Sequence, residues 1–352
     1  KSMQEAVSKM LDIPIKNISL KMTRMGGGFG RRLYTHFGLE AAAISKKIGA
    51  PVKMVYTRED DMTQGTYRPA YRSTYKAGLD ENNNLIAFSV KGVGLPDGPV
   101  IPDRFPAGSV DNYIGQNKSS FTNISVGAWT APRSHFTAGA EQSFLDEVAE
   151  LAGKDPIDFR LELFDRALKN PVGDEYDYDA ERNAGVLKYA GVLKLVKEKS
   201  DWGNDGSSSK KGVAAYFCHD SYVAVVMEVV MKNDEPKVKK VWCAADCGIV
   251  INKEGATNMI EGRIIDGIGH AMYSELKFEN GSSVHKNFDT YNFIRHDQSP
   301  SDIETYFVES ETAPTGLGEP SYPPAVGALA NALYRATGKR FYHQPYSNEI
   351  GT

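Results

Sequence analysis

Segments with helical periodicity alternate with segments of strand periodicity along all 352 residues of the chain, and this mixture restricts the fold more than any other feature. Apolar residues at helical spacing from Met3 to Leu11 predict a first helix. The segments 18–22 and 51–56 are typical of strands, and the segment 37–48 between them is typical of a helix. A chain that mixes both periodicities predicts the α+β class, with mixed sheets and packed helices.

The remaining segments continue this mixture. Residues 67–94 alternate as two strands around a turn at 80–84, whereas 95–120 is rich in Gly, Pro and Asp and predicts a long loop. Asp155 is a typical N-cap for a helix that begins at Pro156. The other predicted elements are helices over 138–152, 156–168, 184–199, 254–273 and 325–337, a strand hairpin over 222–231 and 238–245, strands within 275–308, and linkers over 173–181 and 207–211.

The composition limits the kinds of partner and metal site. The 45 acidic and 41 basic residues give a formal net charge of −4, which argues against a nucleic-acid groove and favours a small molecule or a protein as partner. No apolar run reaches the roughly 20 residues that cross a bilayer. The three cysteines, Cys218, Cys243 and Cys247, lack paired spacing, so we expect neither a disulfide framework nor an iron–sulfur or zinc site in this chain. Any metal would then arrive on a cofactor.

A glycine-rich segment, Gly26–Gly30, lies between a predicted strand and a predicted helix. Glycine lets the backbone approach a ligand closely and point N–H groups at an anion, and Arg31 and Arg32 add positive charge beside the segment. The spacing fits neither GxGxxG nor a P-loop, and no acidic residue follows about 20 residues on as a dinucleotide site requires. A phosphate or pterin loop and a tight structural turn are both open interpretations.

Glu319 lies in the segment Gly316-Leu317-Gly318-Glu319-Pro320, which is flexible before the carboxylate and rigid after it. Such a loop can hold one carboxylate in a pocket as a general base. A glutamate beside glycine and proline is also typical of a solvated turn, so the motif alone is ambiguous.

The segment Cys218-His219-Asp220 contains residue types that bind metals. No second cluster of ligands has a suitable spacing. The sequence therefore favours a loop or strand-end role for these residues over metal ligation.

Five motifs in their order resemble the xanthine dehydrogenase and aldehyde oxidase family of molybdenum hydroxylases. Within this family the chain is similar to the C-terminal half of the large (beta) subunit of the isoquinoline 1-oxidoreductase type. The resemblance covers nearly the whole chain, and the ordered set is far more specific than any one motif. The motifs are Met25–Arg32, Gly127–Trp129, Glu141–Ala149 followed by Asp155-Pro156, Asp246–Gly248 and Gly316–Pro320, with Ala330–Ala332 and Ala336–Gly338 fitting the family's closing helix.

The resemblance implies molybdenum-cofactor-binding domains of the aldehyde oxidase and xanthine dehydrogenase type. It assigns a first cofactor-binding lobe with the glycine-rich loop to 1–125, a helical middle section to 126–205, and a second cofactor-binding lobe with the catalytic glutamate loop to 206–352. Glu319 falls on the family's catalytic base, and Phe29 would shape the pocket near the metal. The residues implied to contact molybdopterin are Gly26, Gly27, Gly28, Phe29, Gly30, Ser221, Tyr222, Val223, Ala224 and Gly318. Plain strand patterning explains residues 221–224 equally well.

Three features depart from the family pattern. Thr130 stands where the family commonly has an arginine, so an expected basic contact near the substrate or cofactor is absent. Met259 stands where relatives often have a glutamine, and a thioether cannot donate an amide hydrogen bond. The family's large subunit also has an N-terminal half with other site residues. Because this chain opens at Lys1 directly into a helix pattern, we expect a cut through a longer protein.

The resemblance implies a molybdopterin-dependent oxidoreductase, in which this chain is part of a molybdenum hydroxylase. The enzyme would oxidise an aldehyde or an N-heteroaromatic carbon, with water as the oxygen source. It would carry molybdenum on the cytosine dinucleotide form of molybdopterin. Its expected partners are an iron–sulfur electron-transfer subunit and the N-terminal half of the large subunit, and its expected location is a bacterial periplasm ahead of the cytoplasm. The alternative is a non-catalytic or cofactor-free fragment with the family fold that acts as a binding scaffold.

Overall fold

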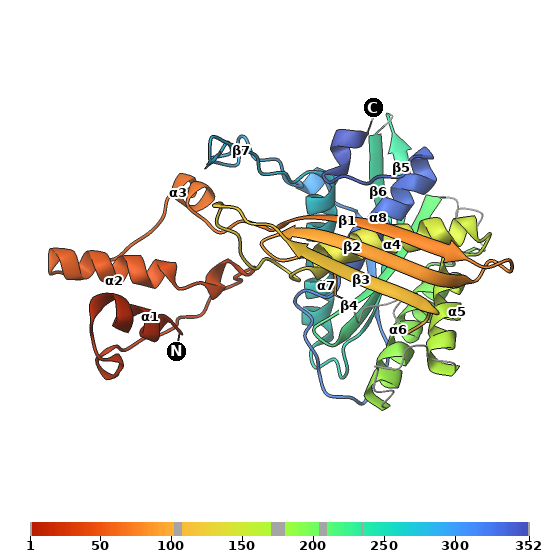
Figure 1. The fold of residues 1–352 in the computed structure, drawn as a ribbon, viewed down its shortest axis with the longest axis horizontal. Coiled ribbons are helices and arrows are strands. Elements are labelled where there is room, and N and C mark those ends of the chain that lie inside the picture. The colour runs from red at the N-terminus through yellow and green to blue at the C-terminus, as the bar shows by residue number, and fades with distance from the viewer. Residues whose placement is uncertain (1, 102–107, 170–179, 204–209, 234, 351–352) are drawn as a thin grey trace. The chain divides into compact units, whose positions relative to one another are not determined.

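The computed structural model describes residues 2–101, 108–169, 180–203, 210–233 and 235–350, whose elements are shown in Figure 1. The contacts divide the chain into two units. Unit 1 comprises Lys1–Pro69, Thr122–Thr130 and Leu276–Tyr291, and unit 2 comprises Ala70–Phe121, Ala131–Glu275 and Asn292–Thr352. The three lobes expected from the sequence are continuous ranges of the chain, whereas the two units are each made of several separate segments. The three lobes stay a prediction. Within the described residues, no helix combines the length and the apolar character needed to cross a bilayer.

Unit 1 is built from short helices and a small hairpin. α1 Ser2–Leu11 and α2 His36–Ile48 confirm the first two predicted helices. They pack so closely that a side chain at Gly38 would collide with Met3. The other elements are α3 Arg58–Thr63, which begins at a capping box formed by Thr57 and Asp60, and the strands β7 Phe278–Glu279 and β8 Ser282–Ser283.

The two strands predicted for unit 1, at 18–22 and 51–56, are wrong. Both segments are irregular, and neither pairs with another strand among the described residues. Met22 is 84% exposed and Val55 is 77% exposed, so the apolar side chains of these segments do not cover a core. A strand needs a partner for its backbone N–H and C=O groups, and local alternation does not reveal whether one is available.

The first sheet of unit 2 has the order β1-β2-β3, formed by β1 Ala70–Leu79, β2 Leu85–Leu95 and β3 Asn112–Ser119. β1 and β2 form the predicted antiparallel hairpin, and the Asp80 carboxylate accepts backbone hydrogen bonds within its turn. The long loop predicted over 95–120 is partly wrong, because β3 pairs in parallel with β2. Asn117 of β3 accepts a hydrogen bond from the Val100 N–H at 2.8 Å, which holds the segment after β2 against this sheet.

The second sheet of unit 2 has the order β4-β5-β6-β9. β5 and β6 are the predicted hairpin, whereas β4, on the other side of β5, was not predicted as a strand. β9 joins the other edge in parallel with β6, so both larger sheets are mixed, as predicted. The strands are β4 Lys211–Cys218, β5 Ser221–Lys232, β6 Glu235–Asp246 and β9 Asp302–Phe307.

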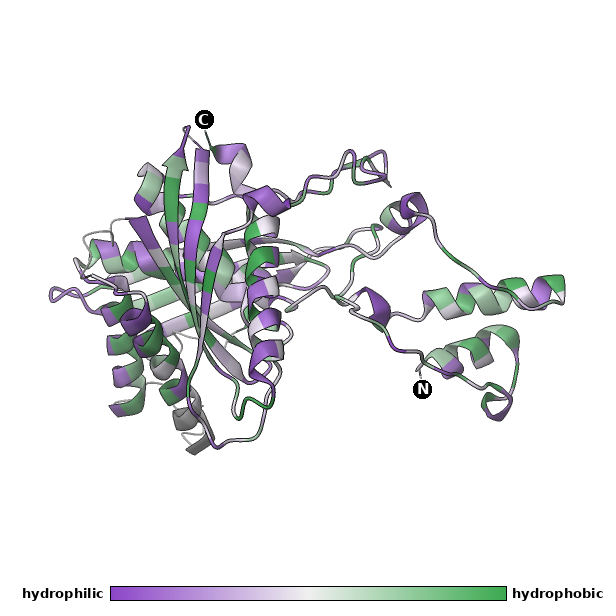
Figure 2. Cartoon of the chain, turned by 180° about the vertical axis from the view of Figure 1, so that it is seen from behind, coloured by the Kyte–Doolittle hydropathy of each residue, from purple (hydrophilic) through white to green (hydrophobic). Residues whose placement is uncertain are grey.

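Helices cover both faces of the second sheet. α8 Tyr322–Thr337 packs on one face, where a Cβ added to Gly327 would lie 2.9 Å from the Ala214 side chain of β4. The next residue, Ala215, points to the opposite face and joins a hydrophobic cluster with Leu193 of α6 Ala180–Lys199. Figure 2 shows hydrophobic residues along the long strands between these helices. The remaining helices are α4 Ser134–Leu151, α5 Pro156–Lys169 and α7 Lys253–Met272.

A buried polar cluster joins α4, α5, α8 and β4. Gln142 Oε1 accepts hydrogen bonds from Arg160 Nε (2.9 Å) and from the Ala215 N–H (3.2 Å). Asn331 Nδ2 donates to the carbonyls of Val213 (2.9 Å) and Gln142 (3.2 Å). Gln142 and Asn331 are both fully buried. The family segments that contain them, Glu141–Ala149 and Ala330–Ala332, therefore form part of the core of unit 2.

Capping residues define two of the predicted helix ends in unit 2. Asp155 accepts hydrogen bonds from the N–H groups of Ile157 (2.9 Å) and Asp158 (3.1 Å), which confirms it as the N-cap of α5. Gly338 ends α8 at φ 73°, directly after the predicted last helical residue, Thr337. The linker predicted over 173–181 lies mostly outside the described residues, as does that over 207–211.

Candidate active site

The glycine-rich loop of unit 1 leaves its backbone accessible. Gly26 and Gly27 are exposed, and a side chain at Gly26 would meet open space. Within the described part of the chain, the N–H groups of Gly26, Gly27 and Gly28 donate no hydrogen bond. Phe29 has φ 50°, its ring lies against Gly27, and 52% of the residue is exposed. The loop therefore offers backbone donors and an aromatic ring to a ligand.

The same loop is fixed at its far end by the Gly127–Trp129 motif. Gly30 has φ 89°, and a Cβ at this position would lie 2.3 Å from the Ala128 carbonyl oxygen. The Thr130 N–H donates to the Phe29 carbonyl at 3.3 Å, and the Ala128 N–H donates to the Tyr34 hydroxyl. Two of the five family motifs are thus in direct contact in unit 1. Only glycine permits this approach of the two backbones.

The two arginines beside the loop have different surroundings. Arg31 is engaged by the Asp61 carboxylate at 3.1 Å and by His36 Nε2 at 2.9 Å, and its guanidinium lies over the Phe37 ring. Burial and the neighbouring Arg31 charge lower the pKa of His36. Arg32 lies against Gly28 and donates to Met25 Sδ at 3.3 Å. Of this pair, Arg32 is therefore the one directed along the glycine-rich loop.

The loop that carries Glu319 in unit 2 is anchored to α7. Arg263 Nε donates to the Gly318 carbonyl at 2.7 Å, and Ser321 Oγ donates to the Ile260 carbonyl at 3.0 Å. The Tyr322 N–H donates to the Glu319 carbonyl at 3.0 Å as α8 begins. These contacts fix the backbone on both sides of a carboxylate whose side chain is 29% exposed.

The turn between β4 and β5 holds the other side of this loop. His219 and Asp220 have φ 51° and 60°, the two left-handed positions of a type I′ hairpin turn. The His219 carbonyl accepts the Gly316 N–H at 3.3 Å, and Ser221 Oγ donates to the Gly316 carbonyl at 2.6 Å. Ser221, predicted to contact the cofactor, therefore lies next to the Glu319 loop.

The Asp246–Gly248 motif supports the same loop from the end of β6. Gly248 has φ 70°, and a Cβ there would lie 2.2 Å from the Ala313 carbonyl oxygen. The Thr315 N–H donates to the Cys247 carbonyl at 2.9 Å. Burial raises the pKa of the Cys247 thiol. The fourth family motif thus packs against the residues directly before the fifth in unit 2.

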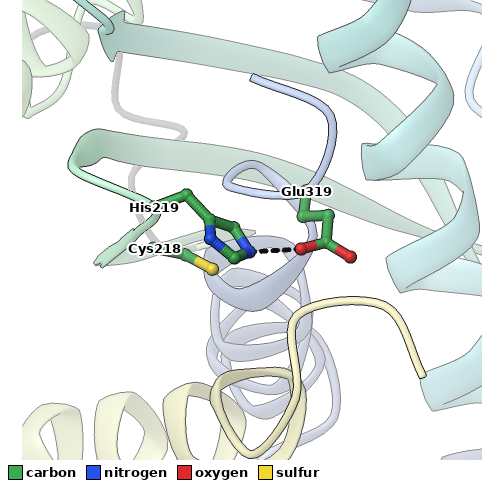
Figure 3. Close-up of side chains that lie close together, drawn as sticks. All are labelled: Cys218, His219 and Glu319. Carbon is green, nitrogen blue, oxygen red and sulfur yellow. Dashed lines mark hydrogen bonds and ion pairs between the residues drawn. The ribbon is translucent and has the colours of Figure 1, made fainter. Parts of the chain in front are cut away.

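Three side chains converge where the turn meets the loop. His219 Nε2 and Glu319 Oε2 are hydrogen-bonded, and the Cys218 thiol lies beside them (Figure 3). Their potential ligand atoms all lie within 4.8 Å of one another. Sequence reasoning missed this cluster because His219 and Glu319 are 100 residues apart, and local spacing cannot reveal a contact across that separation.

The other predicted cofactor residues of β5 are committed to the sheet. Val223 and Ala224 are fully buried, and both pair with β4 on one side and β6 on the other. The Tyr222 ring stacks on Phe217 with centroids 5.2 Å apart. Their predicted role at a cofactor stays a prediction, whereas Ser221 contacts the Glu319 loop directly.

Met259 and Thr130, the two residues that depart from the family pattern, lie close to the Glu319 loop and to the Gly127–Trp129 motif, respectively. A Cβ added to Gly318 would lie 3.3 Å from the Met259 methyl group, so Met259 borders the residue before Glu319. Met259 is 44% exposed. Thr130 is buried in unit 1, directly after the Gly127–Trp129 motif.

Comparisons with known families agree with the family resemblance. A family model described as a molybdopterin cofactor-binding domain matches residues 1–164, and a second family model with the same description matches residues 148–300. The chain is 28% identical to a membrane-bound aldehyde dehydrogenase (pyrroloquinoline-quinone) of Gluconacetobacter polyoxogenes, over 96% of this chain and 47% of that protein. It is also 28% identical to isoquinoline 1-oxidoreductase subunit beta of Brevundimonas diminuta, over 96% of this chain and 43% of that subunit. The chain thus spans less than half the length of these two relatives.

Solved structures share the fold at low sequence identity. Quinoline 2-oxidoreductase from Pseudomonas putida 86 has a TM-score of 0.77 and 12% identity, covering 99% of this chain and 70% of that chain. The aldehyde oxidoreductase from Desulfovibrio desulfuricans ATCC 27774 has a TM-score of 0.75 and 14% identity, covering 91% of this chain and 53% of that chain. The predicted fold class is confirmed. The chain belongs to the xanthine dehydrogenase and aldehyde oxidase family of molybdopterin cofactor-binding proteins.

Proposed function

We propose that this chain forms part of the molybdopterin-binding subunit of a molybdenum hydroxylase, with Glu319 as its catalytic base. The observation that carries the proposal is the anchoring of the Glu319 loop by α7, by the β4–β5 turn and by the Asp246–Gly248 motif. A general base works best when its carboxylate is held in one position relative to the reacting group. A solvated turn would not need this many supports.

The glycine-rich loop fits an anionic pterin cofactor. The N–H groups of Gly26, Gly27 and Gly28 are not used within the described residues, and Gly26 has open space where a side chain would stand. Backbone N–H groups without internal partners are suitable donors to phosphate or pterin oxygens. We propose that this loop of unit 1 contacts the cofactor. For unit 2, taken by itself, we propose Gly318 and Ser221 as cofactor contacts beside Glu319.

When bound, the molybdenum cofactor supplies a two-electron oxidant, and water is the oxygen source. The chain's own contribution is the position of the Glu319 carboxylate. With Oε2 engaged by His219, Oε1 has no hydrogen bond within the described residues and is the oxygen that can accept a proton. The fixed backbone on both sides of Glu319 keeps this oxygen in place during the transfer.

The names of the relatives support a proposal for the substrate class. Isoquinoline, quinoline and nicotinate are N-heteroaromatic, and several other relatives are named for aldehydes. Both groups of substrates offer an electron-poor carbon next to a heteroatom. We propose an aldehyde or an N-heteroaromatic compound as the substrate of this enzyme.

One relative is named for pyrroloquinoline quinone, which gives a second candidate cofactor. We favour molybdopterin because both family models describe that cofactor and together cover residues 1–300. Elemental analysis of the complete protein separates the two, since molybdenum accompanies only the pterin. Activity that depends on the quinone in a protein without molybdenum would contradict our choice.

We further propose that the chain works with the N-terminal half of a large subunit. Unit 1 exposes large apolar side chains, among them Leu33 (71% exposed) and Ile48 (59% exposed). Figure 2 shows hydrophobic residues along α2. A second protein segment that covers them would bury this apolar surface. The cytosine dinucleotide form of the cofactor, an iron–sulfur partner subunit and a periplasmic location extend the same proposal from the family resemblance.

The central test replaces Glu319 by glutamine in the complete enzyme. Glu319→Gln keeps the size of the side chain but removes the base, so turnover of an aldehyde or N-heteroaromatic substrate should fall about 10²- to 10⁴-fold. The molybdenum content should not change. Glu311→Gln is the matched control, because Glu311 is exposed on the segment before the same loop. Normal turnover in Glu319→Gln enzyme with normal molybdenum content would reject the assignment of the base.

A further inference from the structure

We propose that Cys218, His219 and Glu319 form a binding site for a thiophilic divalent cation such as Zn²⁺. Cys218 is the last residue of β4, His219 is the first residue of the following turn, and Glu319 lies in the loop before α8. Figure 3 shows the three side chains directed toward a common point. Each offers one ligand atom, and these atoms are within 4.8 Å of one another.

The chemistry of the three ligands selects the cation. A thiolate, an imidazole nitrogen and a carboxylate oxygen are the ligand types of protein zinc sites, whereas Mg²⁺ and Ca²⁺ prefer oxygen ligands alone. Three protein ligands leave the fourth position of a tetrahedral ion open to water or to a small ligand. On binding, the Cys218 thiol releases its proton to solvent, and the His219–Glu319 hydrogen bond is replaced by two bonds to the ion.

The backbone that carries the ligands is already in place. The His219 carbonyl accepts the Gly316 N–H, and the Ser221 side chain donates to the Gly316 carbonyl, so the turn and the loop are tied together. The three ligand atoms already lie within 4.8 Å of one another, and we expect side-chain rotations to bring them to metal–ligand distance. Cys218 is 6% exposed, while the His219 side chain is 54% exposed, which leaves a route for the ion from the side of the imidazole.

The site would also regulate the enzyme, a consequence that rests on the proposed role of Glu319 as the base. A carboxylate bound to a cation is not available to accept a proton. Zn²⁺ at this position should therefore inhibit turnover without removing molybdenum.

Binding is tested on the complete protein by equilibrium dialysis against Zn²⁺. Elemental analysis then counts zinc and molybdenum separately. We expect one Zn²⁺ per chain, and an affinity reduced at least about tenfold in Cys218→Ser and in His219→Asn. Asparagine tolerates the left-handed backbone of His219, so the turn is kept. Unchanged zinc affinity in either variant would overturn the proposed site, as would displacement of Zn²⁺ by equimolar Mg²⁺.

The matched control is Cys247→Ser. Cys247 is 5% exposed and also follows the end of a strand, but its sulfur is outside the cluster. This variant should bind Zn²⁺ as the wild type does. Loss of zinc in Cys247→Ser to the same extent as in Cys218→Ser would show a general effect on folding and overturn the specific site.

Inhibition is measured as the ratio of turnover rates without and with Zn²⁺. The ratio should be large for the wild type and Cys247→Ser, and close to one for Cys218→Ser. Zinc that binds without changing this ratio in the wild type would overturn the regulatory role. The Glu319→Gln turnover measured without zinc tests the base separately, so the failure of one proposal is distinguishable from the failure of the other.

Discussion

Two glycines of unit 1 allow the effect of backbone conformation on stability to be distinguished from the effect of packing. Gly30 and Gly49 both have a positive φ, 89° and 67°, that disfavours other residues. A Cβ at Gly49 would meet nothing within 4 Å, whereas a Cβ at Gly30 would collide with the Ala128 carbonyl. The difference in the free energy of unfolding between alanine substitutions at these two positions therefore measures the contact between the first two family motifs.

We predict that Gly49→Ala lowers the free energy of unfolding of unit 1 by about 1 kcal/mol, the cost of a left-handed alanine. Gly30→Ala should cost about 2 kcal/mol more, because its methyl group must displace the facing backbone. Unfolding by denaturant, followed by the fluorescence of Trp129, gives the free energy of unfolding of both variants, and Trp129 adjoins Ala128. Equal losses for the two variants would mean that the Gly30–Ala128 contact contributes nothing in solution.

At the scale of single residues, the sequence predicted the family but not the side-chain contacts. The glycine-rich segment and Glu319 were identified from residue type and motif order, and the family is confirmed. The sequence favours a loop or strand-end role for His219, and the structure places it in the turn after β4, but its hydrogen-bond partner Glu319 lies 100 residues away and was not predicted. A long-range side-chain pair leaves no periodicity, so only the folded structure reveals it.

The elements of unit 2 are joined by buried side chains that also belong to family motifs. Asn331 of α8 donates to the carbonyl of Val213 in β4 and to that of Gln142 in α4. Gly212 stands so close to α8 that a Cβ would lie 2.1 Å from the Ala332 nitrogen. This packing fixes the helix that follows Glu319 against the strand that leads to His219.

We predict that Asn331→Leu lowers the free energy of unfolding of unit 2 by about 1–3 kcal/mol, because two buried carbonyls lose a donor. Leucine has a similar volume, so the loss reports hydrogen bonding more than packing. Asn348→Leu is the control, since Asn348 is exposed and its side-chain amide donates across 3.4 Å to the Glu275 carboxylate. Chemical denaturation followed by Trp242 fluorescence gives both values, and a loss no greater than that of the control would refute the role of Asn331.

The same elements show which part of the fold local sequence determines. Helices α4, α5, α7 and α8 were predicted within a few residues, because helical periodicity, caps such as Asp155 and stops such as Gly338 are local signals. The strands were harder to predict than the helices. The segments 18–22 and 51–56 alternate without a partner, and β3 was assigned to a loop although it pairs with β2. Strand formation depends on a distant partner, which periodicity does not encode.

At the scale of the whole molecule, the two units differ in their cores. Of the buried hydrophobic side chains in the described residues, only Val7 belongs to unit 1. Unit 2 contains the hydrophobic cluster between its sheets and helices. Buried apolar surface stabilises a fold by roughly 25 cal/mol per Å², so unit 2 has far more intrinsic stability than unit 1.

We therefore predict that unit 1 unfolds at a lower denaturant concentration than unit 2. The chain has three tryptophans, Trp129 in unit 1 and Trp202 and Trp242 in unit 2, so substitution of the others by phenylalanine leaves one reporter for each unit. The Trp129 transition should precede the Trp242 transition in the isolated chain. Addition of the N-terminal half proposed as partner should raise the Trp129 midpoint, because a ligand that binds only the folded unit stabilises it. Coincident transitions in the isolated chain would show that the two units fold as one, and that the exposed apolar side chains of unit 1 do not limit its stability.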